Sequence, residues 1–319
     1  MLPTSLLAQT ANYACAAAHY KVTALPFHPV RIGNSGVVAG TTEEHHPATW
    51  TEKGGLREIK LPESFTAAEV TGINLAGDIV GFATKSGSSQ TYAFRFSKGK
   101  FALLSEASSK AAAINSSGDA AGQDAEHLVV WRKQKTIRLG GCCGGIAHGM
   151  NNSGEVVGEL NDEQGRYGAF LWDSAHGLRS IAPPQASRSI ALAINDAGHV
   201  LVQSLTPTAV FLRERDTLKP VQLSNEVASQ PLALNICDVI VGEFGVASDF
   251  YHAFIWDKND GLRDLNTLVS TGFEWTLKSA ADINDRGEII GIGAHGDDGD
   301  AGYLLTPDPS AQATKSPSK

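Results

Sequence analysis

The sequence is poor in positive charge and contains no long hydrophobic run. Its 319 residues include 26 Lys and Arg against 34 Asp and Glu, which gives a formal net charge of −8. A basic surface is the electrostatic footprint of most nucleic-acid-binding proteins, so this composition argues against nucleic acid as a partner. Apolar residues nowhere continue for the roughly 18 positions that a membrane-spanning helix needs, and we therefore expect no membrane span.

Short motifs that mark common enzymes are also missing. The chain has no Gly-x-Ser-x-Gly, no phosphate-binding Gly-Lys-Ser or Gly-Lys-Thr, and no Cys-x-x-Cys. The glycine-rich stretch GGCCGG at 140–145 lacks the strand-to-helix context of a dinucleotide site. These absences weaken an enzymatic interpretation without excluding it, because catalytic side chains can come from separate parts of a chain. We expect no catalytic residues and no organic cofactor.

Cysteine is too sparse for a disulfide framework. The four cysteines are Cys15, Cys142, Cys143 and Cys237, whereas disulfide scaffolds concentrate several bridges in a small domain. Cys142 and Cys143 are adjacent, and a bridge between neighbours is strained. We interpret this pair as free thiols in a connection between repeats, and a redox or metal role is the alternative.

A short phrase ending in glycine recurs along the chain. DINDRGEIIG at 282–291 combines an Asn that can hydrogen-bond the backbone two residues on with a glycine that accepts positive φ. This pattern predicts a tight turn between two antiparallel strands. The other copies align with Asn284 at Asn74, Asn115, Asn151, Asn195, Asn235 and, in a degenerate first copy, Gly33-Asn34-Ser35-Gly36. A second glycine follows four places after the turn glycine in most copies.

Each repeat has the composition of four short strands. An alanine-rich strand precedes the Asn, a β-branched strand follows the turn, and a third apolar run ends in a large side chain such as Trp131 or Trp172. A polar turn and one more short strand follow in most repeats. Four strands in about 40 residues is the size of a propeller blade. The sequence therefore predicts an all-β fold, a seven-bladed β-propeller of four-stranded blades.

The two ends of the chain complement each other. The seventh repeat stops after AGYLL at 301–305 without a fourth strand, and HYKVTAL at 19–25 has the alternation of a strand but belongs to no repeat. We therefore expect the N-terminal strand to complete the last blade and close the ring. Residues 19–307 then form the propeller, 308–319 a disordered tail, and 1–18 either a flexible segment or a degenerate secretion signal.

Several phrases resemble the motifs of the HAF repeat proteins, a family of bacterial repeat proteins described as extracellular. YHAFIWD at 251–257, YGAFLWD at 167–173 and MNNSGEVVG at 150–158 are similar to the family motif. The resemblance covers about residues 20–307 and rests on the sevenfold recurrence of short motifs. It implies a β-rich, propeller-like structure outside the cytoplasm, and it implies no catalytic residue or defined ligand.

The repeat provides a rule for locating a functional site. Equivalent positions of seven blades are related by rotations of about 51° and point apart unless they lie at the axis. His46, His127 and His252 each stand four residues before a Trp, so they lie on different blades and we interpret them as structural. A site must come from departures from the repeat or from loops on one face.

Two acidic stretches are such departures. The residues concerned are Glu43, Glu44, His45 and His46 in the first repeat, and Asp297, Asp298 and Asp300 in the seventh. Both stretches connect the second strand to the third, so ring closure would place them on the same face of neighbouring blades. Neither stretch contains Lys or Arg, and crowded carboxylates are stabilised by a shared cation. The sequence therefore predicts weak binding of Ca²⁺ or another divalent metal there, and solvated turns are the alternative.

Function is less constrained than fold. We expect a non-enzymatic binding module outside the cytoplasm, extracellular or periplasmic, acting as a monomer on a protein or carbohydrate ligand. The alternative is a hydrolase or lyase with its site at the mouth of the central channel, and a third hypothesis is a structural array for surface adhesion. An enzyme should show ionisable groups with opposed pKa shifts in one pocket, whereas a binding module should expose a broad face of aromatic or polar side chains.

Overall fold

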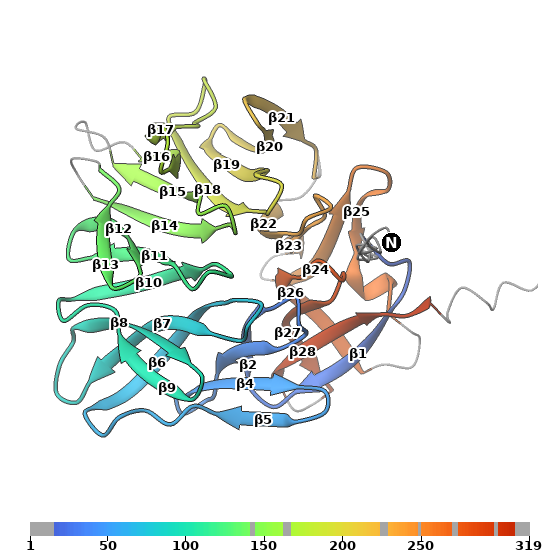
Figure 1. The fold of residues 1–319 in the computed structure, drawn as a ribbon. Coiled ribbons are helices and arrows are strands. Elements are labelled where there is room, and N and C mark those ends of the chain that lie inside the picture. Colours follow the sequence, from blue (N-terminus) through green and yellow to red (C-terminus); the bar gives the residue numbers. More distant parts are fainter. Residues whose placement is uncertain are drawn as a thin grey trace, which may run out of the picture.

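A computed structural model gives the arrangement of residues 16–140, 144–161, 167–223, 229–247, 250–269, 274–296 and 299–309. Within these ranges the chain forms seven four-stranded antiparallel sheets around a common centre (Figure 1). Blades 1 to 3 consist of β2 (His28–Ile32), β3 (Val38–Thr41), β4 (Pro47–Thr51) and β5 (Gly55–Glu58); β6 (Phe65–Ile73), β7 (Ile79–Lys85), β8 (Thr91–Ser97) and β9 (Lys100–Leu103); and β10 (Ser109–Ile114), β11 (Ala120–Asp124), β12 (His127–Arg132) and β13 (Lys135–Arg138).

The remaining blades follow the same order. They consist of β14 (Gly145–Met150), β15 (Val156–Asn161), β16 (Tyr167–Asp173) and β17 (Gly177–Ser180); β18 (Arg188–Ile194), β19 (Val200–Thr206), β20 (Thr208–Glu214) and β21 (Thr217–Val221); β22 (Ser229–Leu234), β23 (Ile240–Ala247), β24 (Phe250–Asp257) and β25 (Gly261–Asp264); and β26 (Trp275–Ile283), β27 (Ile289–His295), β28 (Asp300–Pro307) and β1 (Tyr20–Leu25). A short 3₁₀ turn, η1 (Leu265–Thr267), precedes blade 7. The predicted seven-bladed β-propeller is therefore confirmed. In the described part of the chain, no helix is long and apolar enough to cross a membrane.

The ring is closed by the N-terminal strand, as predicted. β1 pairs antiparallel with β28, with Thr23 opposite Leu304 and Ala24 opposite Tyr303. Tyr20, at the start of β1, is completely buried, and its backbone N–H donates to the carbonyl of Leu268 at 2.8 Å. β1 thereby covers the edge of β28 that the seventh repeat leaves unpaired (Figure 1).

The recurrent turns have the predicted chemistry. The Asn284 side-chain oxygen accepts hydrogen bonds from the backbone N–H groups of Arg286 and Glu288, both at 3.0 Å. Gly287 and the equivalent Gly36 have φ values of +72° and +82°, which a residue with a Cβ adopts at a cost. Gly36 confirms that the first, degenerate copy forms the same turn with Gly33 in the place of the Asn.

Every blade has a β-bulge in its first strand, at the third residue before the turn Asn. In blade 3, for example, Ala111 pairs with Gly122 and Ala113 with Ala121, so Ala112 is left unpaired. The bulge explains the second glycine of the repeat. A Cβ on Gly122 would lie 2.1 Å from the carbonyl oxygen of Lys110, so only glycine fits beside the bulged strand there. Blade 5 carries Val202 at the position opposite Ala191, and its bulge is retained without the glycine.

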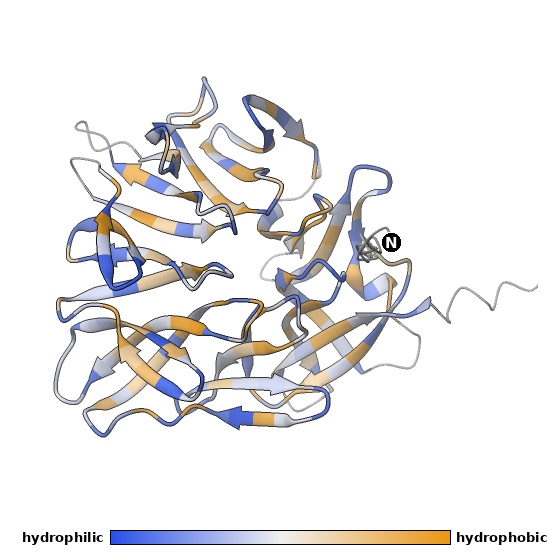
Figure 2. Cartoon of the chain, in the orientation of Figure 1, coloured by the Kyte–Doolittle hydropathy of each residue, from blue (hydrophilic) through white to orange (hydrophobic). Residues whose placement is uncertain are grey.

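The hydrophobic core lies between the blades. Apolar side chains are concentrated along the strands, and polar residues are concentrated in the turns at the rim (Figure 2). One buried cluster, for example, joins Val80 and Ala93 of blade 2 to Ala111 and Trp131 of blade 3. Each blade thus buries its apolar surface against its neighbours, which makes the ring a single cooperative body.

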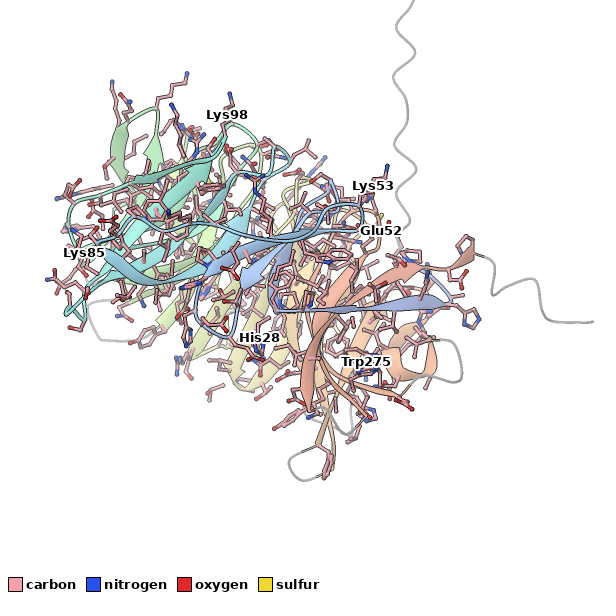
Figure 3. All side chains as sticks on the ribbon, turned by 90° about the horizontal axis from the view of Figure 1, so that it is seen from below. His28, Glu52, Lys53, Lys85, Lys98 and Trp275 are labelled. Carbon is pink, nitrogen blue, oxygen red and sulfur yellow. The ribbon has the colours of Figure 1, made fainter. Side chains whose placement is uncertain are left out.

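The propeller has two faces, which we name by their connections. The turn face carries the Asn turns and the turns between third and fourth strands, and the loop face carries the second-to-third connections and the links between blades. In the side view of Figure 3, Lys53 and Lys98 mark turns of the turn face, while His28 and Trp275, at the starts of first strands, lie toward the loop face.

Candidate functional site

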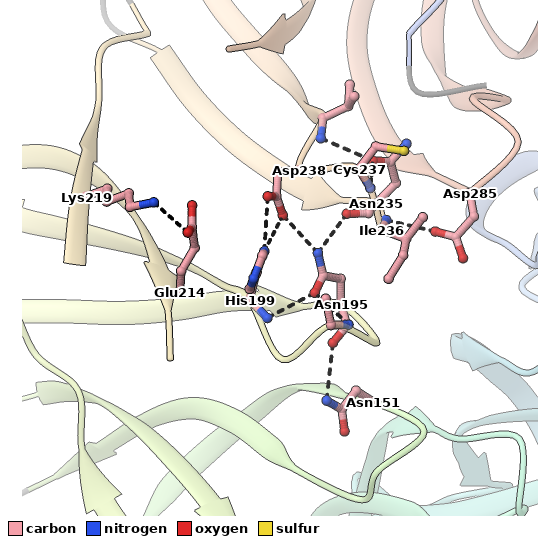
Figure 4. A network of polar contacts seen from close by, with 12 residues as sticks. Asn151, Asn195, His199, Glu214, Lys219, Asn235, Ile236, Cys237, Asp238 and Asp285 are labelled. Atoms are coloured by element: carbon pink, nitrogen blue, oxygen red, sulfur yellow. Dashed lines mark hydrogen bonds and ion pairs between the residues drawn. The ribbon is translucent and has the colours of Figure 1, made fainter. Parts of the chain in front are cut away.

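The turn asparagines link each blade to the next. At five junctions the side-chain amide of the Asn donates to the backbone carbonyl of the equivalent residue in the following blade. Figure 4 shows the bonds that join Asn151 to Asn195 and Asn195 to Asn235. The donor–acceptor pairs are Asn74 to Asn115 (3.0 Å), Asn151 to Asn195 (3.2 Å), Asn195 to Asn235 (2.9 Å), Asn235 to Asn284 (3.3 Å) and Asn284 to Gly33 (3.1 Å). Gly33 has no side chain with which to continue the chain of bonds to Asn74. These asparagines are therefore structural.

A second set of contacts surrounds the channel mouth on the turn face. We call the turn Asn of each blade, or Gly33 in blade 1, the anchor. The residue after the anchor is Asn34, Asn152, Asp196 or Asp285 in four of the blades. Asp285 accepts the backbone N–H of Ile236 at 2.9 Å and the amide of Asn34 at 2.6 Å, and Asp196 accepts both amide groups of Asn152. These side chains line a cavity of about 580 Å³, but their polar atoms are used in blade-to-blade contacts.

Two residues that depart from the repeat line a narrow part of the central channel, which we call the waist. The second residue before the anchor is Gly or Ala in blades 2 to 6, but it is Arg31 in blade 1 and Asp282 in blade 7. Both side chains line a narrow cavity of about 190 Å³. One Asp282 carboxylate oxygen accepts the N–H of Ile32 at 2.9 Å. Burial among neighbouring atoms raises the pKa of Asp282, although the charge of Arg31 and this hydrogen bond act in the opposite direction.

A second cavity, of about 220 Å³, continues from the waist toward the loop face. Arg31, Thr71 and His148 line both cavities, and Lys110 and Phe82 are added here. The Lys110 ammonium lies 4.5 Å from the centre of the Phe82 ring. His148 and Thr71 occupy the bulged position of their strands, because a bulge turns one extra side chain toward the axis. We call this space the loop-face mouth.

His148 also contacts a buried carboxylate behind the cavity wall. Its Nε2 lies 3.8 Å from Glu159 Oε1, and Glu159 is 6% exposed. At that distance there is no hydrogen bond, and His148 Nε2 is buried without a hydrogen-bond partner among the residues that the structure describes. The imidazole therefore retains an unused polar atom beside the loop-face mouth.

The described members of the predicted acidic stretches, Glu43 to His46 and Asp300, are on the loop face of neighbouring blades, where second strands connect to third strands. The described members do not converge. Asp300 pairs with Lys278 of its own blade at 2.5 Å, and His46 lies 3.5 Å from Glu58 of its own blade. The carbonyl of His45 accepts the N–H of Ala68 in blade 2, so this turn is attached on the side away from blade 7.

The metal prediction therefore has no geometric support so far. No group of three or more His, Cys, Asp or Glu side chains could hold a metal ion in the part of the chain that the structure describes. Glu43, Glu44, His45, His46 and Asp300 belong to that part, whereas Asp297 and Asp298 lie outside it. Hydrogen bonds from its own backbone N–H and from Thr42 lower the pKa of the exposed Glu44 carboxyl. Binding of Ca²⁺ at this seam stays a prediction.

The three histidines that precede tryptophans are on separate blades, as expected. His252 Nδ1 lies 2.7 Å from Asp264 Oδ2, and the ring packs edge-on against Phe244. His46 contacts Glu58, and His127 is exposed at the start of β12. Their local contacts agree with a structural interpretation.

Sequence reasoning missed the channel residues. Arg31, Asp282 and His148 depart from positions that the other repeats fill with small or apolar residues. An alignment of the seven first strands would have shown these departures, but the bulge that turns the third residue before the anchor toward the axis was not predicted. The sequence rule, that a site must come from departures, was sound and was applied only to loops.

Cys237 is disulfide-bonded, which was not predicted. It lies at the turn of blade 6, partly buried against the core cluster of blades 6 and 7. The other cysteines, Cys15, Cys142 and Cys143, lie outside the described residues, and the free-thiol interpretation of the adjacent pair stays a prediction.

Comparison with known proteins identifies the class of fold. No protein-family model matches the chain, and no curated protein matches it, so the resemblance to HAF repeat proteins stays a prediction. Among solved structures, YCF48 bound to a D1 peptide is 11% identical with a TM-score of 0.57, over 96% of this chain and 99% of that one. Virginiamycin B lyase from Staphylococcus aureus is 12% identical with a TM-score of 0.63, over 91% and 100% of the two chains.

A third similar structure is a Mycobacterium tuberculosis puromycin-hydrolysing peptidase, 12% identical with a TM-score of 0.58. The match covers 93% of this chain but only 53% of the peptidase. These likenesses establish that the chain is a β-propeller. At such low identity they transfer neither activity nor ligand.

Proposed function

We propose that this propeller is a non-enzymatic binding module that contacts a protein partner through its loop face. The observation that carries the proposal is an exposed apolar tip on blade 6, formed by Val246, Phe250 and Tyr251. Their exposed fractions are 44%, 67% and 50%. Val246 is near the end of β23, and Phe250 and Tyr251 begin β24, so all three lie next to the second-to-third connection on the loop face. Exposed aromatic groups of this kind are typical of interaction surfaces.

Blade 4 extends the apolar character of the same face. Tyr167 and Ile146 are 36% and 42% exposed and begin β16 and β14. The guanidinium of Arg188 lies 4.8 Å from the centre of the Tyr167 ring, which covers the ring face that a sugar would need for stacking. The blade-6 tip includes the aliphatic side chain of Val246, near the end of β23. These two features favour a protein partner, and carbohydrate is the second candidate because the Phe250 ring is freely exposed.

The distribution of perturbed groups favours binding over catalysis. Burial raises the pKa of Tyr20 and Tyr303 at the closure of the ring, far from any shared pocket. The hydrogen bond from Lys219 lowers the pKa of Glu214 on the outer part of blade 5, and Asp282 lies at the axis beside Arg31. These groups do not form the pair of opposed titrating residues that a hydrolase or lyase uses. The enzyme hypothesis would need catalysis by Arg31, Asp282 and His148, the channel residues that depart from the repeat.

An extracytoplasmic location is part of the proposal. Disulfides persist mainly in oxidising compartments, and the Cys237 disulfide supports such a location. The resemblance to HAF repeat proteins implies the same. We further propose that the propeller acts as a monomer, since its ring is closed by its own first strand.

The test compares the native protein with a Phe250→Ser/Tyr251→Ser variant. Immobilised protein is exposed to the envelope and secreted proteins of its host, and a glycan array is probed in parallel. Leu56→Ser is the matched control, because Leu56 is 37% exposed on the outer strand of blade 1. The proposal expects a discrete protein partner that the control retains and the double variant loses. Retention by both variants would refute it, and glycan binding lost in the double variant would favour the second candidate.

A further inference from the structure

The loop-face mouth combines two cations and an imidazole in one cavity. Arg31 comes from blade 1, Lys110 from blade 3 and His148 from blade 4. Since they come from three blades, only the axis brings them together. Lys110 is held above the Phe82 ring, and the buried Nε2 of His148 has no hydrogen-bond partner in the described part of the chain. The cavity therefore presents several donors and few acceptors.

Among the described residues, no carboxylate offsets this charge at the cavity wall. The residues that line the loop-face mouth include no Asp or Glu. Within the described ranges, no ion pair joins Arg31 or Lys110 to an acidic side chain, and the Arg31 guanidinium donates instead to the carbonyl of Val30 at 2.9 Å. Glu159 lies behind His148, outside the lining, and Asp282 lines the waist. In a chain with a net charge of −8, two cations that lack an ion-pair partner in the described part of the chain and line one cavity favour an anion as its ligand.

The remaining wall indicates what kind of anion. Phe82, Ile146 and several alanines provide an apolar surface beside the cations. An inorganic anion would leave this surface unused, whereas an organic acid would place its charge on Arg31 and its hydrocarbon part against the ring. A planar carboxylate matches the fork of a guanidinium in two parallel hydrogen bonds. The two adjoining cavities, of about 190 and 220 Å³, suit a small ligand or a single acidic side chain.

We propose that the loop-face mouth is a carboxylate-binding site in which Arg31 and Lys110 bind the charge and Phe82 binds the carbon chain. The His148 imidazole forms part of the cavity wall, and its buried Nε2 is directed at Glu159 behind that wall. The carboxylate comes either from a free organic acid or from an acidic residue or C-terminus of a peptide. The site is separate from the blade-6 tip, so it goes beyond the proposed function and either proposal can fail alone.

Calorimetry on the full chain at low ionic strength tests the proposal. The probes are succinate, glutarate, a short peptide with a free C-terminal carboxylate, inorganic phosphate and neutral succinamide. We expect binding of at least one carboxylate probe, weaker binding at higher salt, and no binding of succinamide. Saturation by the free diacids or by the peptide distinguishes the two sources. Binding of phosphate as tight as that of every carboxylate, or no heat from any carboxylate at millimolar concentration, would overturn the proposal.

Variants assign the binding to the named side chains. Arg31→Gln and Lys110→Gln should each weaken the carboxylate affinity at least tenfold. Lys85→Gln is the matched control, because the Lys85 ammonium lies 4.1 Å from the centre of the Tyr92 ring but does not line the channel. The control should bind within twofold of the native protein. Equal losses in all three variants would place the ligand elsewhere.

Chemical modification of the native protein avoids reliance on the folding of variants. Lysine acetylation followed by mass spectrometry should show that a saturating carboxylate probe slows modification of Lys110 several-fold and leaves Lys85 unchanged. Unaltered acetylation of Lys110 at saturation would refute its role even if binding is observed.

Discussion

Replacing Gly33 with asparagine should stabilise the propeller, because Gly33 stands where the other six blades have the anchor Asn. Its φ is not in the positive range, so a side chain is tolerated by the backbone. A Cβ at this position would have the carbonyl oxygen of Asn74 as its nearest neighbour, at an ordinary 3.5 Å. The amide of the introduced side chain would then reach this carbonyl as Asn284 reaches Gly33, and would supply the missing link between blades 1 and 2.

The size of the effect follows from two separable contributions. Replacing glycine by a residue that fits its conformation reduces the entropy of the unfolded chain and adds about 0.4–1 kcal/mol. A buried hydrogen bond to the Asn74 carbonyl adds about 0.5–1.5 kcal/mol, and the acceptor oxygen of the new side chain caps the turn as Asn284 does. Gly33→Ala isolates the first contribution. We therefore expect the Gly33→Asn variant to exceed the Gly33→Ala variant by about 1–2 kcal/mol.

Thermal and urea unfolding of the native protein and these two variants measure this difference. For a chain of 319 residues, about 1–2 kcal/mol corresponds to a rise in Tm of roughly 1.5–3 °C. Asn195→Ala provides the reciprocal measurement, because it removes the bond to Asn235 and the caps on Ala197 and His199. A Gly33→Asn variant no more stable than the Gly33→Ala variant would show that the inter-blade amide bonds do not hold the ring together.

Three other perturbations test the fold and the channel. Deleting residues 1–25 should lower the Tm sharply, since β28 then loses its partner along a whole edge, and a melting curve like that of the native protein would contradict closure. Gly287→Val and Gly36→Val should each cost about 1–3 kcal/mol in urea unfolding, because a β-branched residue is strained at positive φ; Gly168→Val is the control, because Gly168 is outside that region and a Cβ there would have no atom within 4 Å. Asp282→Asn should raise stability at pH 7 and leave it nearly unchanged near pH 3. The folded-state pKa of Asp282 is raised, so the folded protein holds this proton longer than the unfolded chain and loses stability as the pH rises through that interval. A stability difference that does not change with pH would contradict the raised pKa.

The fold could be predicted because each repeat carries the same sequence signals for a four-stranded blade. A single copy of Asn-x-x-Gly is a weak signal, but seven copies with the same flanking pattern exclude most other architectures. The closure by β1 followed from counting strands in the first and last repeats. Asp238 shows that the turn keeps its backbone conformation even where the sequence departs from the repeat. It adopts φ of +62° at the place of the turn glycine, and contacts from His199 at 2.9 Å and Asn195 at 3.0 Å accompany this conformation (Figure 4).

The bulge and its glycine could not be predicted from strand patterns alone. Period-two alternation assumes continuous pairing, and one unpaired residue reverses the direction of every side chain before it. The second glycine, at Gly122 and its equivalents, marks the bulge in the sequence, but its meaning depends on the distance to a carbonyl across the strand pair. For this reason His148 was not recognised as a residue of the channel wall.

The acidic stretches show the opposite limitation. Their residues are conspicuous in the sequence, and the described members, Glu43 to His46 and Asp300, lie on the same face of neighbouring blades. Proximity along a rim does not fix side-chain direction, however, and the partners of Asp300 and His46, which are Lys278 and Glu58, come from positions outside both stretches. Which charges offset one another depends on residues that are neighbours in space, and the local sequence does not show these neighbours.

Most departures from the repeat at the axis lie at the seam where the ring closes. Gly33 and Arg31 belong to blade 1 and Asp282 to blade 7, and these two blades are joined through Asn284, Ile32 and their turns. A repeat array loses little stability when one junction differs, because each blade contacts only its two neighbours. The junction between blades 1 and 2 lacks the amide hydrogen bond because Gly33 has no side chain, whereas the seam between blades 7 and 1, where Arg31 and Asp282 meet, retains it from Asn284 to Gly33. Arg31 and the missing link beside Gly33 are then two features of the same degenerate repeat, whereas Asp282, Lys110 and His148 come from blades 7, 3 and 4.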